Sequence, residues 1–298
     1  MKLLVTGANG NLAGAVINKL QTLLPDIKIL AVGTRNPDSA YARQLSARGI
    51  AVRHLDFLDP GSLDRALAGV GRMLMISTYE PNTIRIQQHR NAVTAAVKAG
   101  VRHLVYTSCI NASPASLFEH NSQVHAPTEA MVKDSGLQYT FLRHNLYAEF
   151  LLMDLKQTLA TGTLERGGGN ARLSVIGRDD LGVSAAMVLA GSGHENKIYT
   201  ETGPEALSYA EIAAILSEVF ERAIRFVDVT PDQWYQRSLS LGYPEPVARA
   251  SRSNVMAAIN GEFSAVSPDY QKITGRPPRA LRQLLSENKS RFLRMYAA

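Results

Sequence analysis

The chain has 298 residues with 45% hydrophobic and 19% charged content, which is typical of a globular protein with a sizeable core. Its single cysteine, Cys109, excludes an intramolecular disulfide and a cysteine-based zinc cluster, and the net charge of +6 is too scattered to indicate nucleic-acid binding. With no signal-peptide pattern and no apolar run near about eighteen residues, we expect a cytoplasmic protein without membrane contact.

A short apolar run from Leu3 to Thr6 opens the chain and is cut by a glycine-containing segment. Apolar residues then recur at helical spacing from Leu12 to Leu23. The order strand, glycine turn, helix is the context that a dinucleotide-binding fingerprint requires. In that context Gly7 allows a tight turn, Gly10 leaves room for a pyrophosphate, and the helix offers free N–H groups. The residues predicted to bind the cofactor here are Thr6, Gly7, Asn9, Gly10, Asn11 and Leu12.

Strand and helix patterns alternate through the rest of the first half. The further strands are predicted at 27–32, 51–55, 72–76, 101–106 and 137–142. The helices between them are predicted at 38–47, 60–68, 86–99 and 128–135. Such alternation predicts an α/β fold of Rossmann type, a doubly wound parallel sheet with helices on both faces.

From about residue 151 the alternation weakens and helical patterns dominate. The helices are predicted at 146–160, 179–190, 208–220, 231–241, 246–258 and 281–292, with short strands at 198–200 and 224–227. We therefore predict an NAD(P)-binding domain at 1–150 and a smaller, mostly helical substrate domain at 151–298. The sheet can regain a strand from the later segments. Because ligands bind at the carboxyl ends of strands in such sheets, the second domain should cover that edge.

The predicted strand ends carry further candidate cofactor contacts. Arg35 follows the second strand, where it favours the 2′-phosphate of NADP(H), although an ordinary surface arginine is the alternative. Asp56 and Phe57 follow the third strand, and Asp56 either accepts a hydrogen bond from adenine or caps a turn. The nicotinamide end is expected to pass polar residues after the fourth and fifth strands, namely Ser77, Thr107 and Ser108.

The catalytic residues are less clearly marked. Short-chain dehydrogenases use Tyr-x-x-x-Lys as proton donor, and no such spacing occurs in this sequence. In its place stand His125 and Glu129, so His125 is a candidate general acid, with a local ion pair as the alternative. Asn145 and Tyr147 follow the sixth strand, where Tyr147 either stacks on an aromatic substrate, donates a proton or only packs. No third ligand supports a metal site.

Several motifs in order resemble the NmrA-like group of atypical short-chain dehydrogenases. They are Thr6-Gly7-Ala8-Asn9-Gly10-Asn11-Leu12, Arg35-Asn36-Pro37, Tyr106-Thr107-Ser108, His125-x-x-Thr128-Glu129 and Tyr139-Thr140-x-Leu142-Arg143-x-Asn145-x-Tyr147. Within that group the likeness is to bacterial NAD(P)H:quinone oxidoreductases and triphenylmethane dye reductase. Either His144 or Asn145 can occupy the asparagine position of the family pattern.

The resemblance implies NADP(H) as cofactor and direct hydride transfer to a quinone or similar flat, electrophilic acceptor, without the Tyr-x-x-x-Lys pair. The expected partner is a small aromatic or quinone-like substrate. The sequence does not decide whether the protein forms a homodimer. The competing interpretation is a non-catalytic NADP(H) sensor that acts through a protein partner. A reductase of some other small molecule is a third, because loop residues set the substrate.

Overall fold

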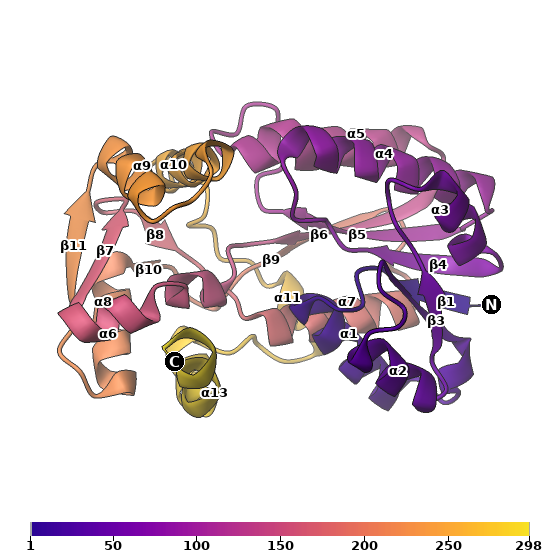
Figure 1. The fold of residues 1–298 in the computed structure, drawn as a ribbon, viewed down its shortest axis with the longest axis horizontal. Helices are drawn as coiled ribbons and strands as arrows, with labels where there is room; N and C mark the ends of the chain where they lie inside the picture. Colours follow the sequence, from indigo (N-terminus) through magenta and orange to yellow (C-terminus); the bar gives the residue numbers. More distant parts are fainter. Residues whose placement is uncertain (1, 298) are drawn as a thin grey trace.

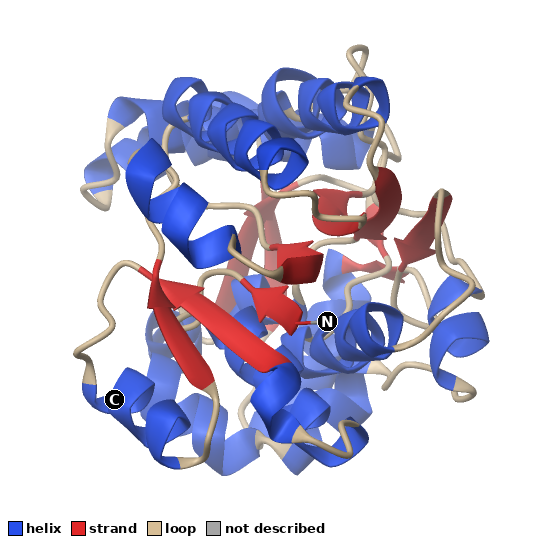
Figure 2. Cartoon of the chain, turned by 90° about the vertical axis from the view of Figure 1, so that its right-hand side faces the viewer, coloured by secondary structure: helices blue, strands red, loops and turns tan. Residues whose placement is uncertain are grey.

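Seven parallel strands form the central sheet of the structure, a computed structural model that describes residues 2–297 (Figures 1 and 2). In chain order they are β1 (Lys2–Val5), β2 (Leu30–Thr34), β3 (Ala51–His54), β4 (Val70–Met75), β5 (His103–Cys109), β6 (Gln138–His144) and β9 (Lys197–Glu201). Across the sheet the order is β3-β2-β1-β4-β5-β6-β9. The order reverses between β1 and β4, the position at which doubly wound sheets bind ligands.

Helices cover both faces of this sheet, as Figure 1 shows. One face is covered by α1 (Asn11–Leu23), α2 (Ala40–Ala47) and α7 (Arg178–Ala190), and the other by α3 (Pro60–Leu67), α4 (Asn82–Lys98) and α5 (Ala126–Asp134). Local sequence explains where they begin: the Ser39 and Asp59 side chains cap α2 and α3. The α1–α7 contact is close because a Cβ on Gly182 would lie 2.4 Å from that of Ala15.

The second half builds an apolar core of its own beside the sheet. Its strand pairs are β7 (Thr163–Gly167) with β11 (Arg225–Val229) and β8 (Arg172–Leu173) with β10 (Leu207–Ser208). Its helices are α6 (Leu155–Thr161), α8 (Tyr209–Phe220), α9 (Pro231–Ser240), α10 (Glu245–Ile259), α12 (Leu281–Glu287) and α13 (Lys289–Tyr296). The segment α11 (Asp269–Thr274) packs instead on α7 and β9.

The predicted fold class, a Rossmann-type doubly wound sheet with a helical C-terminal part, is confirmed. The strand predicted at 198–200 is β9, which pairs with β6, so the second half does return to the sheet. The division into domains at residue 150 stays a prediction.

Three element predictions need correction. The strand predicted from 27 begins only at Leu30, because Asp26 caps a 3₁₀ turn, η1 (Ile27–Ile29). The helix predicted at 146–160 is instead a 3₁₀ turn, η3 (Ala148–Leu152), followed by the short α6. The closing helix at 281–292 is interrupted at Asn288, where the chain passes from α12 to α13.

Candidate active site

The glycine loop between β1 and α1 is tight and carries no bulky side chains. Gly7 has a φ of +67°, and its carbonyl oxygen accepts a hydrogen bond of 2.8 Å from the amide of Gly10. A Cβ added to Gly10 would lie 3.2 Å from that same oxygen, so a side chain at this position would be crowded by the turn. Thr6 is fully buried, and its hydroxyl accepts a 2.9 Å hydrogen bond from the Ile76 amide, so it joins the ends of β1 and β4.

The N-terminus of α1 is left open to a ligand. Gly10 is the N-cap, no side chain caps the helix, and its first turn carries no acidic residue. The first amides of the helix and its partial positive charge therefore suit an anionic group such as a pyrophosphate. Asn11 is exposed, Leu12 packs in a small apolar cluster, and Asn9 Oδ1 lies 3.4 Å from the hydroxyl of Ser39.

Arg35 stands at the end of β2 with 69% of its side chain exposed. Its Nη1 lies 3.5 Å from a carboxylate oxygen of Glu80, which belongs to the loop after β4. This loop thus reaches from the end of β4 to the end of β2. An exposed guanidinium at this position is suited to a 2′-phosphate.

Asp56 Oδ1 accepts a 2.9 Å hydrogen bond from the Leu58 amide, so this oxygen caps a turn, which was one of the two roles expected for Asp56. Phe57 is buried, and its carbonyl accepts a hydrogen bond from Asn91. These two residues therefore shape the turn after β3, while any contact to adenine stays a prediction.

The residues expected at the nicotinamide end are tied together at the ends of β4 and β5. The Ser77 amide donates to the hydroxyl of Thr107 at 2.9 Å. Ser108 donates at 2.7 Å to Glu129, whose carboxylate also receives a two-pronged contact from Arg143 at 2.6 and 2.9 Å. The buried hydroxyls of Thr107 and Ser108 are thus already engaged within the protein.

His125 is buried in a polar cluster and does not suit the general-acid role expected for it. Its Nδ1 lies 2.8 Å from the hydroxyl of Tyr106, and its Nε2 lies 3.3 Å from Nη2 of Arg85. Because a guanidinium only donates, Nε2 must accept, and the imidazole is neutral. Burial, reinforced by the charge of Arg85, lowers the pKa of His125 well below its ordinary value. Glu129, one turn further on, pairs with Arg143 rather than with His125.

Asn145 is buried, and its amide is fully used inside the protein, which argues against direct contact with a substrate. Nδ2 donates to the Ser174 hydroxyl and to the Phe263 carbonyl, at 2.6 and 3.0 Å, while Oδ1 accepts from the Leu146 amide. It joins the end of β6 to segments of the second half. His144 is also buried, with Nε2 3.2 Å from a carboxylate oxygen of Glu201.

Tyr147 lies just after the end of β6, in contact with an aromatic and a cationic neighbour. Its ring stacks on Phe150 with centroids 5.5 Å apart, and the guanidinium of Arg178 lies 5.0 Å from the Tyr147 centroid. Its hydroxyl is 3.2 Å from Nδ1 of His144, and burial raises the pKa of this phenol. Tyr147 also packs against the cluster of Leu12, so it lies near the start of α1.

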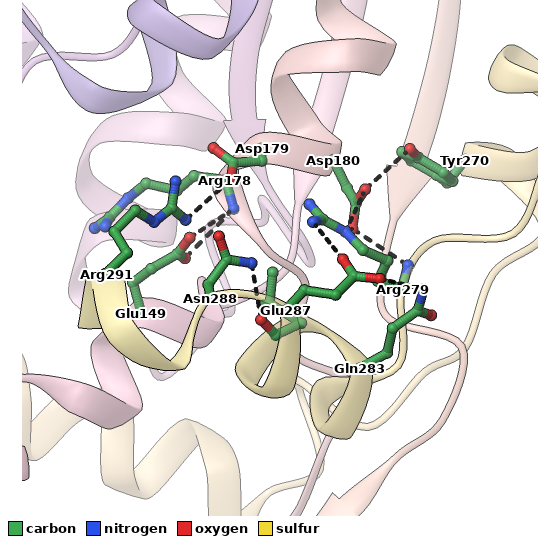
Figure 3. A network of polar contacts seen from close by, with 11 residues as sticks. Glu149, Arg178, Asp179, Asp180, Tyr270, Arg279, Gln283, Glu287, Asn288 and Arg291 are labelled. Atoms are coloured by element: carbon green, nitrogen blue, oxygen red, sulfur yellow. Dashed lines mark hydrogen bonds and ion pairs between the residues drawn. The ribbon is translucent and has the colours of Figure 1, made fainter. Parts of the chain in front are cut away.

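The start of α7, which carries Arg178, is held by a polar network (Figure 3). The Glu149 carboxylate accepts from the Arg178 amide at 3.1 and 3.3 Å. The buried Asp180 accepts from Arg279 at 3.1 Å, from the segment that leads into α12. These contacts fix the backbone from which Arg178 reaches Tyr147.

Sequence reasoning missed three side chains near this edge: Arg85, Tyr79 and Arg178. A signal for Arg85 was present, because α4 buries polar residues at helical spacing, with Arg85, Gln88 and His89 on one face. Tyr79 is 79% exposed on the loop after β4, and no pattern marks it.

Within residues 2–297, no helix is long and apolar enough to cross a membrane. Over the same described range, no group of three or more His, Cys, Asp or Glu residues is arranged to hold a metal ion.

The strand order, the open glycine loop and the exposed cation beside it define a Rossmann-type dinucleotide-binding protein. Comparison with known families places it more closely: the model of the NmrA-like family matches residues 1–292. The chain belongs to the NmrA-like family, as its motifs had indicated.

The relatives cover nearly the whole chain. Quinone oxidoreductase 2 of Escherichia coli strain K12 is 33% identical over 95% of this chain and 96% of its own length. The NAD(P)H azoreductase of Xenophilus azovorans is 31% identical over 97% and 99%. Among solved structures, Citrobacter sp. triphenylmethane reductase complexed with NADP(H) superimposes with a TM-score of 0.88 at 34% identity, covering 96% and 99% of the two chains.

Proposed function

We propose that this protein is an NADPH-dependent reductase that transfers hydride directly to a quinone or a similar flat, electrophilic acceptor. The observation that carries the proposal is the open glycine loop with an exposed arginine beside it, in a chain that lacks Tyr-x-x-x-Lys. The relatives that act on quinones and dyes with NAD(P)H support the same class of reaction.

The residues at the carboxyl edge fit NADP(H). The amides at the start of α1 and the small Gly10 would hold the pyrophosphate, while Arg35 would hold the 2′-phosphate. A charge-assisted contact of this kind is worth about 1.5–3 kcal/mol, or about ten- to a hundredfold in affinity. When bound, the cofactor supplies the hydride.

At the acceptor end the chain offers orientation rather than a proton donor. His125 is neutral and engaged, and Asn145 has no free donor. The raised pKa of Tyr147 makes its hydroxyl a weak acid. An acceptor that is already electrophilic needs mainly a flat surface that holds it against the nicotinamide, and its proton can come from water. We assign that surface to the stacked rings of Tyr147 and Phe150.

Loss of NADPH absorbance tests the proposal, with benzoquinone, naphthoquinone, a triphenylmethane dye and a simple ketone as acceptors. NADH runs in parallel. We expect turnover of the quinones or the dye, with NADPH preferred and the ketone inert. Tight NADPH binding without turnover of any acceptor would contradict the reductase and favour an NADP(H) sensor.

A further inference from the structure

Arg85 of α4 is a buried cation without a counter-ion. Only 5% of the residue is exposed, and its Nε is sealed from solvent without a hydrogen-bond partner. Its Nη2 donates to the Ser77 hydroxyl at 2.8 Å and lies 3.3 Å from Nε2 of His125. In the part of the chain that the structure describes, no carboxylate forms an ion pair with it.

The titratable groups around this guanidinium do not supply the missing negative charge. Burial lowers the pKa of His89 to about 3 and that of His120 to about 4, so both are neutral at pH 7. Burial also raises the pKa of Cys109 to about 12, which keeps the thiol protonated. The charge of Arg85 is therefore compensated by neutral dipoles alone.

An uncompensated buried cation is unfavourable for folding. Charges inside proteins are normally paired, and replacing an inadequately paired one by an apolar side chain of similar size is often neutral or stabilising. Ser77 and His125 give the guanidinium one hydroxyl and one ring nitrogen, which is less than its five N–H donors require. The cluster is therefore incomplete without an anion.

The guanidinium of Arg85 lies at the carboxyl end of the sheet, because it contacts the hydroxyl of Ser77 just after β4. Ser77 follows β4, Cys109 ends β5 and Tyr147 follows β6, and both Cys109 and Tyr147 interact electrostatically with Arg85. Its Nη1 makes no hydrogen bond within the described chain and, unlike Nε, is not among the atoms sealed from solvent. Nη1 is thus the donor left for a ligand at this edge.

We infer that Arg85 binds an anionic oxygen of the acceptor, so that the preferred acceptors are flat molecules that carry a carboxylate, a sulfonate or an ionised hydroxyl. The inference rests on the proposed function, since it places the acceptor at this edge. The anionic groups of the cofactor have other partners there, namely the start of α1 and Arg35. An anion at Arg85 would therefore belong to the second substrate.

A matched pair of quinones tests this inference. The acceptor 2-hydroxy-1,4-naphthoquinone is ionised at pH 7, whereas its 2-methoxy analogue is neutral and of similar size. For each protein, kcat/KM for the ionised quinone is divided by kcat/KM for the neutral one. The readout is the double ratio, which is this quotient in a variant divided by the quotient in the wild type, because it cancels the intrinsic reactivity of the two quinones. Arg85→Met should lower it about ten- to a hundredfold, and Arg85→Lys, which keeps the charge without the fork, should lower it less.

The control is Arg90→Met, which removes an exposed arginine from the same helix. It should leave the double ratio unchanged. An unchanged double ratio in Arg85→Met would overturn the inference. A loss of NADPH affinity in Arg85→Met that matches the loss of turnover would also overturn it, by assigning the guanidinium to the cofactor.

Binding separates this inference from the proposed function. Calorimetry measures the affinity of the two quinones for the protein saturated with NADP⁺, where no turnover can occur. If the wild type reduces neither quinone but binds the ionised one more tightly, and Arg85→Met loses that difference, the anion site stands while the reductase fails. Equal affinity for both quinones in the wild type would overturn the anion site.

Discussion

Replacing Glu80 with Gln should tighten the binding of NADPH and leave that of NADH unchanged. The carboxylate of Glu80 lies 3.5 Å from Nη1 of Arg35, the residue that we assign to the 2′-phosphate. In the free protein this carboxylate forms an ion pair with the guanidinium, which NADPH would have to break. In the NADPH complex the carboxylate would lie near the 2′-phosphate, which is also negative. Both effects weaken the binding of NADPH. Neither affects NADH, which carries a 2′-hydroxyl in place of the phosphate.

The size of the effect follows from the exposure of the pair. Two unit charges 3.5 Å apart attract each other by about 1.2 kcal/mol in water. Because the two side chains are 69% and 34% exposed, screening and side-chain entropy reduce this to about 0–1 kcal/mol. Repulsion of the phosphate adds a term of the same sign and order. The dissociation constant of NADPH should therefore fall about two- to fivefold.

Fluorescence titration of both cofactors at low and high salt measures this change. The gain should shrink as salt rises, since exposed charges are screened. Arg35→Asp is the matched counterpart and should weaken NADPH much more than NADH. The reasoning is refuted if Glu80→Gln tightens NADH equally. It is also refuted if the gain for NADPH is just as large in the Arg35→Asp background, where no guanidinium is left to release and only the repulsion of the phosphate remains.

Two further outcomes follow from buried groups. Tyr147→Phe should keep turnover of flat acceptors within about threefold while Tyr147→Ala lowers it more than about tenfold, because stacking needs the ring and not the hydroxyl; a large loss in the Phe variant, measured by NADPH oxidation, would contradict this. Acid should destabilise the fold. Burial lowers the pKa of His89 to about 3, those of His103 and His120 to about 4 and that of His125 well below 6.5, so between pH 6.5 and about pH 4 the unfolded chain binds up to about four more protons than the folded one at these groups. Their contribution to the free energy of unfolding is fully present above pH 6.5 and falls by up to about 5.4 kcal/mol per pH unit below it. Urea unfolding at several pH values checks this slope, which His89→Gln should lower by about a quarter and His54→Gln, an exposed control, should not change.

The first half of the fold was predictable because each element is marked within its own segment. Apolar runs give the strands, and caps such as Ser39 and Asp59 mark where helices begin. The segment after β6 was not predictable in this way. Its apolar content is helical, but Tyr147 pairs with the distant Ile176 and holds the backbone extended before η3 begins. A contact made across the fold thus overrides the local preference.

The residues of the candidate site also differ in whether local sequence or distant contacts determine their surroundings. The glycine loop and Arg35 are defined by their place next to a strand, and the sequence shows that place directly. The setting of Asn145 depends instead on Ser174 and Phe263, which lie 29 and 118 residues away. The setting of His125 depends on Arg85, which comes from another helix. Residue type and local spacing alone could not show that these two side chains are already occupied.

The treatment of other buried arginines supports a ligand at Arg85. Arg166 is 8% exposed and is paired with Asp154 at 2.6 Å. Arg143, partly buried, donates to both carboxylate oxygens of Glu129. In both of these cases a carboxylate compensates the guanidinium inside the chain. Arg85 is as deeply buried as Arg166 and lacks such a partner. Because the cost of burial is similar while the internal compensation is absent, the missing charge has to come from outside the chain, and the carboxyl edge of the sheet is where a substrate would bring it.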